Sequence, residues 1–404
     1  MPDTGTHYDL VLKGGRILDP ANQLDAVTDI GVNDGHIAAI GTIAAERGRE
    51  SVDCSGKLVT PGFIDGHVHF YASGHGGLES ADEPGSKAGA ATVIDGGSSG
   101  YLTFPDFKAR HLVPPVTDAY CYLHHNPAGQ ITLPELWGPK LKVDYARIRE
   151  TIRENRRYIV ALKDRAVGAF VQGMGIEGVE KARQVCSDCG IPYAMHIGLE
   201  LNDTVPDREL NAFTRDVLRM LAPGDILTHA CTGKRGHIFR EDGLFDREIR
   251  DAYERGVVFD CSNGVLNFSA ESFRTGRERG FLPHILATDN SPWGTRETVR
   301  NLGVVMSKFL ALGVPLDRLV AMVTWNAAQA VGLHTSKGRL DVGRQADITV
   351  TELERGDYRF LDHLHGEVLF GDTLMVPRLT IIRGVIYPTV NVGGPTMPEF
   401  QGMP

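Results

Sequence analysis

The chain has 404 residues, with 42 Lys and Arg against 51 Asp and Glu and a formal charge of −9. This acidic balance, without a Lys/Arg run, argues against binding to nucleic acid or to an anionic membrane surface. Hydrophobic residues make up 42% and charged residues 23%, as in ordinary globular proteins, and no apolar stretch approaches the ~18 residues of a membrane span. Because the 6 cysteines are too few for a disulfide scaffold and no signal-peptide pattern opens the chain, we expect a cytoplasmic protein.

Both ends of the chain predict β structure. Residues 1–57 include the alternating run Tyr8–Leu12 and an Asn-Asp-Gly turn at 33–35, which is a strong hairpin signal. Residues 337–404 return to strand patterns, for example in Ala346–Thr351. Neither end is long enough to bury a large core alone, so we expect the two ends to pack together as one small β-sandwich domain.

Between the two ends, residues 58–336 alternate between strand-like and helix-like stretches. Repeated strand–helix units imply parallel pairing, and eight such strands match the ~250-residue (β/α)₈ TIM barrel in number and length. An open doubly wound sheet is the alternative, but it does not require eight strands. The predicted strands are Leu58–Ile64, Ala91–Ile94, Val116–Leu123, Tyr158–Leu162, Ile191–Met195, Asp225–Thr228, Val257–Asp260 and Pro283–Thr288.

Residues able to bind a metal ion follow five of these eight predicted strands. They are His67 and His69 after the first, Lys163 after the fourth, His196 after the fifth, His229 after the sixth and Asp289 after the eighth. Positions i and i+2 of a strand point to the same side, so His67 and His69 can share one ion. A single histidine at a strand end is more often structural. However, barrel strands converge at their carboxyl ends, so six candidates there favour a metal centre, with zinc suited to imidazole ligands.

Lys163 admits two interpretations. A bare ammonium beside two cations would be repelled, so the side chain either points elsewhere as a neutral amine or has reacted with carbon dioxide. The resulting carbamate is an anion whose two oxygens can bridge two metals. The apolar run Tyr158–Leu162 before it favours the neutral amine, which is the form that reacts. Position alone leaves both interpretations open.

Sequence runs around these residues carry a family resemblance. The runs are LVTPGFIDGHVHF, YIVALKDRA, YAMHIG, ILTHACTG and ILATDN, bracketed by VLKGGRILDP and GRLDVGRQADITV. They resemble the amidohydrolase superfamily, in particular its dihydroorotase-like metallo-deacetylase branch, over nearly the whole chain. The resemblance implies a (β/α)₈ barrel with a β-sandwich made from both termini.

The same resemblance implies a dinuclear metal centre. By it, His67, His69 and Asp289 hold the more buried of two divalent ions. His196 and His229 hold the other ion, and a carboxylated Lys163 bridges the pair. All six family positions are filled in this sequence, which argues against a metal-free, non-catalytic relative.

The predicted chemistry is hydrolysis. Two cations that share a water lower its pKa from ~15.7 toward neutrality. We therefore expect metal-bound hydroxide to cleave an amide or ester bond of a small acylated substrate, with Asp289 as the proton shuttle. An N-acyl amino acid or O-acyl hydroxy acid is the leading substrate class. Opening of a cyclic amide, as in hydantoinase or dihydroorotase-like members, is the alternative.

Substrate contacts are expected from loops that follow the strands. Arg165 could clamp a substrate carboxylate with its planar fork, although a structural ion pair explains it equally well. Tyr71, His125, Asn263 and Trp293 are expected in the pocket wall, with His125 and Asn263 as polar contacts. The sequence leaves the oligomeric state open, a homo-oligomer included.

Two further motifs are interpreted as structural. The run GMGIEG at 173–178 matches the dinucleotide fingerprint, but it does not follow the first strand of a Rossmann unit, so we expect a loop. His363 and His365 repeat the His-x-His spacing without a second set of ligands, so we expect them at the surface.

Overall fold

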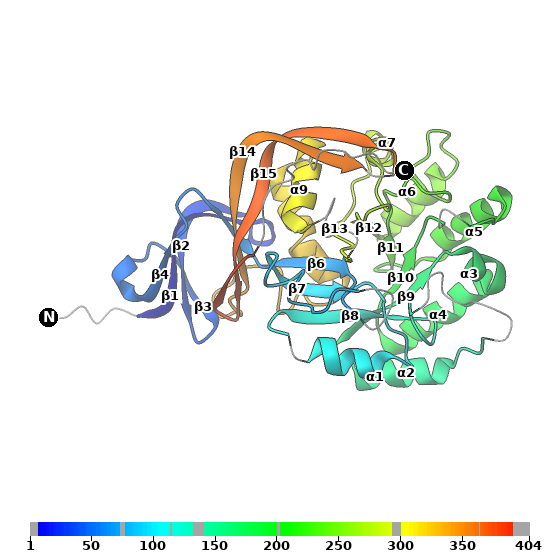
Figure 1. The fold of residues 1–404 in the computed structure, drawn as a ribbon, viewed down its shortest axis with the longest axis horizontal. Coiled ribbons are helices and arrows are strands. Elements are labelled where there is room, and N and C mark those ends of the chain that lie inside the picture. The colour runs from blue at the N-terminus through cyan, green and yellow to red at the C-terminus, as the bar shows by residue number, and fades with distance from the viewer. Residues whose placement is uncertain are drawn as a thin grey trace.

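The computed structural model describes residues 7–72, 77–113, 115–131, 141–199, 203–292, 300–362 and 364–390. One of its two sheets has eight parallel strands that pair in chain order (Figure 1). The strands are β6 (Phe63–Val68), β7 (Ala90–Asp95), β8 (Asp118–His124), β9 (Ile159–Arg165), β10 (Tyr193–His196), β11 (Ile226–Thr228), β12 (Val258–Ser262) and β13 (Ile285–Ala287).

The first and last strands of this sheet meet at their carboxyl ends. A bridge joins Val68 to Asn290, and the backbone N–H of Asp289 donates to the carbonyl of His67 at 2.7 Å. These contacts nearly close the sheet into a barrel, and the predicted (β/α)₈ architecture is confirmed.

Barrel strands are buried on both faces, which explains their continuous apolar sequences. In β9, Ala161 belongs to the cluster inside the barrel, whereas Leu162 packs with the outer layer. Because successive side chains of a strand alternate, Lys163 and Arg165 share the inward side with Ala161. Asp164 therefore points outward, toward the helices.

Helices surround the barrel on its outside (Figure 1). Side chains of Asp144, Ser269 and Asn301 accept hydrogen bonds from the first turns of α2, α7 and α9, as N-cap residues do. No helix in the described part of the chain is long and apolar enough to cross a membrane. The α-helices with described bounds are α1 (Phe104–Phe107), α2 (Tyr145–Glu154), α3 (Gly168–Gly173), α4 (Gly175–Cys189), α5 (Asp207–Met220), α6 (Asp246–Arg255), α7 (Ala270–Glu278), α9 (Leu302–Ala311), α10 (Leu316–Met322) and α11 (Trp325–Ala330).

The prediction of a loop at 173–178 is wrong. These residues span the end of α3 and the start of α4, and Gly175 at φ 53° makes the change of direction between the two helices. A backbone with positive φ suits glycine, so the glycines here serve the junction.

Both chain ends share a second sheet, as predicted, and it is a mixed sheet with the order β16-β15-β14-β5-β1-β2-β3 and β4 paired to β1. One hydrophobic cluster draws residues from both ends, including Leu12 and Ile348. The strands are β1 (Tyr8–Asp19), β2 (Leu24–Asn33), β3 (His36–Gly41), β4 (Gly48–Asp53), β5 (Leu58–Pro61), β14 (Ile348–Asp362), β15 (Glu367–Ile382) and β16 (Val385–Pro388).

The predicted first barrel strand, Leu58–Ile64, is in fact two strands. β5 pairs with β1 and β14 in the terminal sheet, and only β6 enters the barrel. Gly62 lies between them, where a Cβ atom would come within 2.6 Å of the Ala91 side chain. The chain therefore passes from the terminal sheet to the barrel at Gly62.

The hairpin of β14 and β15 reaches from the terminal sheet over the barrel (Figure 1, orange). The Ser307 hydroxyl on α9 accepts a hydrogen bond from the Met375 N–H at 2.7 Å. At the far end of the hairpin, the Asp362 carboxylate accepts one from the Ala270 N–H at the start of α7. Of the His-x-His pair beyond Asp362, His365 is exposed as predicted, and His363 lies outside the described residues.

Candidate metal centre

A cavity of about 380 Å³ opens at the carboxyl ends of the barrel strands. All six predicted metal ligands line it, and five of them are buried, while His69 keeps 19% of its side chain exposed. The six are His67, His69, Lys163, His196, His229 and Asp289. Side chains from five strands thus meet in one place, as convergence of the strand ends predicts.

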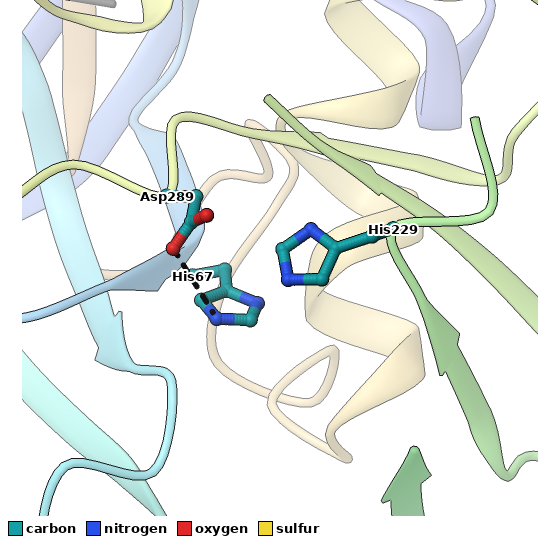
Figure 2. Close-up of side chains that lie close together, drawn as sticks. All are labelled: His67, His229 and Asp289. Atoms are coloured by element: carbon teal, nitrogen blue, oxygen red, sulfur yellow. Dashed lines mark ion pairs between the residues drawn. The ribbon is translucent and has the colours of Figure 1, made fainter. Parts of the chain in front are cut away.

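Three of these residues form a group that could hold a metal ion. His67, His229 and Asp289 each offer a ligand atom, and these atoms lie within 4.8 Å of one another (Figure 2). Asp289 Oδ1 is 3.6 Å from His67 Nε2 and 3.3 Å from His69 Nε2. The rings of His196 and His229 are neighbours, with centroids 4.3 Å apart.

Local backbone geometry directs two of these side chains. His229 and Asp289 have φ of 63° and 51°, in the left-handed region that non-glycine residues rarely adopt. His229 directly follows β11, and Asp289 lies two residues after the end of β13. Such strained conformations cluster at functional sites. Gly96 leaves room for the site, because a Cβ atom there would lie 2.2 Å from His67 Nε2.

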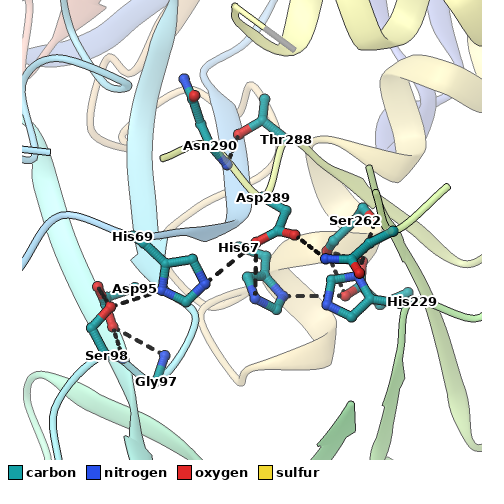
Figure 3. Close-up of polar contacts among 12 residues, drawn as sticks. His67, His69, Asp95, Gly97, Ser98, His229, Ser262, Thr288, Asp289 and Asn290 are labelled. Atoms are coloured by element: carbon teal, nitrogen blue, oxygen red, sulfur yellow. Dashed lines mark hydrogen bonds and ion pairs between the residues drawn. The ribbon is translucent and has the colours of Figure 1, made fainter. Parts of the chain in front are cut away.

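Neighbouring groups fix which nitrogen of His69 and His229 faces the cavity. His69 Nδ1 lies 2.8 Å from the Ser98 hydroxyl, which in turn donates to Asp95 (Figure 3). His229 Nδ1 lies 3.0 Å from the carbonyl oxygen of Ser262. In each case an acceptor engages Nδ1 and leaves Nε2 for a metal, as is usual for metal-ligating histidines.

A buried carboxylate also lies near His67, but beyond hydrogen-bond distance of its ring. Asp260 Oδ2 is 3.6 Å from His67 Nδ1, and the Ser262 hydroxyl donates to the Asp260 carboxylate. Burial raises the pKa of Asp260 to about 6. Asp260 is therefore a buried carboxyl group close to the His67 ring without a direct hydrogen bond to it.

Burial sets the protonation of the candidate ligands. It lowers the pKa of His229 to about 3 and holds the pKa of His67 and His196 well below the usual value. Burial also lowers the pKa of Lys163 to about 7. For Asp289, burial alone would raise the pKa, but the neighbouring side chains of His69, His67 and His229 lower it further than burial raises it. Neutral imidazoles and an ionised carboxylate are the forms that bind metals.

Unpartnered polar atoms show that the residues fit such an ion. His196 Nε2 and Lys163 Nζ are buried without a hydrogen-bond partner among the described residues. Leaving buried polar atoms unpaired is costly, so native structures supply a partner. Imidazole nitrogens with a carboxylate oxygen form the donor set of zinc and related divalent ions.

The five predicted substrate contacts have three different outcomes. Arg165 and Tyr71 line the cavity, and the Tyr71 hydroxyl donates to Asp106 at 3.0 Å. Trp293 lies outside the described residues. The other two, His125 and Asn263, are not among the described residues that line the cavity.

His125 belongs to a buried network on the outside of the barrel. Its Nδ1 contacts both oxygens of Asp164 at 3.0 Å, and its Nε2 is 3.2 Å from the Tyr145 hydroxyl. The Tyr193 hydroxyl donates to the same Asp164 at 2.9 Å. The prediction of a substrate contact at His125 is therefore wrong, because its partner Asp164 has the outward position in β9.

Asn263 is likewise buried behind the cavity. Its Oδ1 accepts a hydrogen bond from Lys308 Nζ at 3.1 Å, and its backbone N–H donates to Ala287. Asn267, four residues further along the same loop, lines the cavity in its place. Both are polar residues after the seventh strand, so the sequence signal does not distinguish them.

Lys234 is a second lining residue that the sequence reasoning missed. It follows the sixth strand and is 5% exposed, and Arg165 is 6% exposed. The two place positive charge on the wall of a cavity whose candidate ligands include only one described carboxylate, Asp289. This wall suits a substrate with an anionic group.

Fold and site together define a (β/α)₈-barrel protein with a candidate metal centre at the carboxyl ends of its strands. A sequence model described as the Amidohydrolase family matches residues 58–387. The chain belongs to this family, as the sequence runs predict, and it is a hydrolase that acts on C–N bonds.

Relatives and solved structures agree with this membership. A deacetylase of Agrobacterium fabrum (strain C58 / ATCC 33970) is 32% identical over 364 residues, which cover 88% of this chain and 85% of that protein. The structure of an adenine deaminase aligns with a TM-score of 0.84 at 25% identity, covering 95% of this chain and 100% of that one. A dihydroorotase structure aligns with a TM-score of 0.82 at 28% identity, covering 94% and 99%.

Proposed function

We propose that this protein is a metal-dependent hydrolase that removes the acyl group from a small acylated substrate bearing a carboxylate. An N-acyl amino acid or an O-acyl hydroxy acid fits this description. The observation that carries the proposal is the cavity lined by four histidines, a buried lysine and an aspartate. The similarity to a deacetylase supports the choice of acyl substrates.

In this proposal the cavity holds two divalent ions, with zinc favoured by the imidazole ligands. His67, His69 and Asp289 would hold one ion, and His196 and His229 the other. A carboxylated Lys163 would bridge them. Support for the carbamate is the buried amine with a pKa of about 7, which is neutral often enough to react with carbon dioxide. When bound, the ions activate water and polarise the acyl carbonyl.

The chain's own residues would move the proton and hold the substrate. Asp289 is ionised and accepts the proton of the attacking water, then delivers it to the leaving nitrogen or oxygen. Arg165 and Lys234 bind the substrate carboxylate at the cavity wall through charge-assisted hydrogen bonds.

A second candidate is opening of a cyclic amide, and the aligned dihydroorotase structure favours it. The same metal chemistry and proton transfer serve both reactions. The residues of the cavity wall therefore determine which class of substrate is cleaved. We further propose a cytoplasmic location for the protein and leave its assembly, monomer or homo-oligomer, to measurement.

The test is elemental analysis of the purified protein together with a substrate panel. The panel contains N-acetyl amino acids, O-acetyl hydroxy acids, hydantoins and dihydroorotate. We expect about two divalent ions per chain and deacylation of the acyclic compounds. Preference for hydantoins or dihydroorotate would instead support the second candidate, and hydrolysis without bound metal would contradict the proposal.

A further inference from the structure

Two apolar side chains occupy a turn beside the candidate metal centre. Val265 and Leu266 lie in the turn after β12, are partly buried and line the cavity. Turns are usually built from Gly, Pro, Asn, Asp and Ser, so two successive apolar residues are unusual there. In the described part of the chain, neither side chain packs against a hydrophobic cluster. Since the protein core does not explain them, they indicate contact with a molecule that enters the cavity.

The turn is held against Asp289, the proposed proton shuttle. Its backbone comes close at Gly264, which has φ 54°, and a Cβ atom there would lie 2.4 Å from Asp289 Oδ2. Asn267 Nδ2 donates a hydrogen bond to the same oxygen at 2.7 Å. Val265 and Leu266 lie between these two contacts in the chain, so the turn keeps them next to the group that moves the proton.

The positive charge of the cavity lies on another part of its wall. Arg165 is the last residue of β9, and Lys234 lies beside the residues after β10, because a Cβ atom on Gly198 would come within 3.2 Å of the Lys234 Cβ. The eight strands pair in chain order and nearly close into a ring, so β9 and β10 lie opposite β13 and β6. β12, which precedes the apolar turn, is the neighbour of β13. Cationic and apolar residues therefore face each other across the candidate metal centre.

Tyr71 extends the apolar part of the wall. It follows β6, whose end meets the segment after β13, and it lines the cavity. Its ring packs against Phe107 and His111, with centroids 5.1 and 5.6 Å away, and its hydroxyl donates to Asp106. Because the hydroxyl has a partner and the ring is packed, Tyr71 provides a fixed aromatic surface.

The proposed substrate has its carboxylate and its acyl chain on opposite sides of the scissile carbonyl. With the carboxylate on the cationic wall and the carbonyl at the metal centre, the acyl chain extends toward the apolar wall. We propose that Val265, Leu266 and Tyr71 form a pocket for this chain, the acyl pocket, and that the protein prefers N-acyl amino acids with an apolar acyl chain longer than acetyl. This inference rests on the proposed function and narrows its substrate class.

The experiment varies the acyl chain and the leaving amino acid separately. One series contains N-acetyl-, N-propanoyl- and N-butanoyl-alanine, and the other contains the N-acetyl derivatives of glycine, alanine and norvaline. Each buried CH₂ group is worth about 4-fold, so kcat/KM should rise about 15-fold from acetyl to butanoyl. From alanine to norvaline, which also adds two CH₂ groups, it should change by less than about threefold. No rise in the first series, or an equal rise in the second, would overturn the proposal.

Two variants change the wall in opposite directions. Leu266→Ser removes apolar surface, so the butanoyl-to-acetyl ratio should fall to about threefold or less, whereas Leu266→Phe fills the pocket and should make the butanoyl compound the poorer substrate. Each ratio compares two substrates of one protein, so losses of folding or of bound metal cancel. Leu102→Ser is the matched control, since Leu102 is 66% exposed and is not among the described residues that line the cavity. A fall of the ratio in this control, or an unchanged ratio in both Leu266 variants, would contradict the acyl pocket.

Binding of uncleavable analogues provides a readout independent of turnover. In these ketones a CH₂ group replaces the amide N–H of N-acetyl- and N-butanoyl-alanine. Calorimetric titration should show about 15-fold tighter binding of the butanoyl analogue, and Leu266→Ser should remove most of this difference. Equal affinities in the unmodified protein, or binding of neither analogue, would contradict the acyl pocket. Failure of the proposed function looks different, because the metal-loaded protein would then hydrolyse no member of either series.

Discussion

At the scale of single residues, the alternation of side chains along a strand determines which residues face the cavity. In β9 the consecutive residues Lys163, Asp164 and Arg165 are all buried, yet they serve different purposes. Lys163 and Arg165 line the cavity, while Asp164 anchors His125 on the outer side. Three adjacent charged residues are tolerated in one strand because each has a polar setting on its own side.

Asp289 is the residue whose replacement tests the proton shuttle most directly. Asn has nearly the same shape and keeps an oxygen ligand, so Asp289→Asn should largely retain bound metal while kcat falls by about 10²- to 10⁴-fold. Elemental analysis and steady-state kinetics check both parts. Full activity in this variant would refute the shuttle role.

Lys308 makes stability depend on pH. It is buried on α9, donates to Asn263 and lies 5.0 Å from the centre of the Phe268 ring. Burial lowers its pKa to about 8, below the ~10.4 of an unfolded chain. Below pH ~8 the buried charge therefore lowers the free energy of unfolding by its full amount. This loss of stability disappears as pH rises toward ~10.4, where the unfolded chain also loses the proton.

The prediction for Lys308 uses a variant without the titrating group. Relative to Lys308→Met, the unmodified protein should gain stability between pH ~8 and ~10.4, by about 3 kcal/mol at most. Denaturant unfolding of both proteins across this range measures the difference. A difference that stays constant or shrinks with pH would show that Lys308 is not held with a lowered pKa.

At the scale of elements, the long β14–β15 hairpin and one buried lysine join the terminal sheet to the barrel. Lys337 is buried and forms ion pairs with Asp118, at the start of barrel strand β8, and with Asp347, just before β14. Its pKa is raised, because the two carboxylates together outweigh the burial that would lower it. Lys337 is thus charged at neutral pH, and its contribution to stability is fully present below the unfolded pKa of lysine.

Removing Lys337 should weaken the contact between the terminal sheet and the barrel. Lys337→Met leaves the largely buried Asp347 without its lysine partner, while Asp118 keeps its ion pair with Arg383, and the free energy of unfolding should fall by about 3 kcal/mol at pH 7. Lys181→Met is the control, since Lys181 pairs with Glu177 at an exposed position on α4 and should change stability by less than about 0.5 kcal/mol. Equal effects of the two variants would contradict a structural role for Lys337.

At the scale of the whole molecule, bound metal should stabilise the barrel. The candidate ligands come from five strands distributed around it, so an ion at their centre ties the strand ends together. Chelation should abolish activity and lower Tm, and at free metal 1,000 times the Kd the loss is about 4 kcal/mol. Calorimetry before chelation, after it and after adding zinc back measures this change. An unaltered Tm would argue against a metal that binds only the folded state.

Much of the architecture and the candidate ligand set could be predicted from the sequence. Eight apolar runs predict the barrel, and residues such as His229 and Asp289 mark strand ends that must converge. These signals are local, because each depends on a strand pattern and the residues directly after it. The two chain ends could also be assigned to one domain, since neither can bury a core alone.

Only the tertiary structure decided which polar residues face the cavity and which support it. Asn263 and Asn267 give the same signal, but Lys308 engages the first and Asp289 the second. Asp260 approaches His67 from a different strand, and sequence spacing does not encode that distance. The physical reason is that a loop's course depends on what packs against it, whereas the strands that precede it are determined by their own apolar patterns.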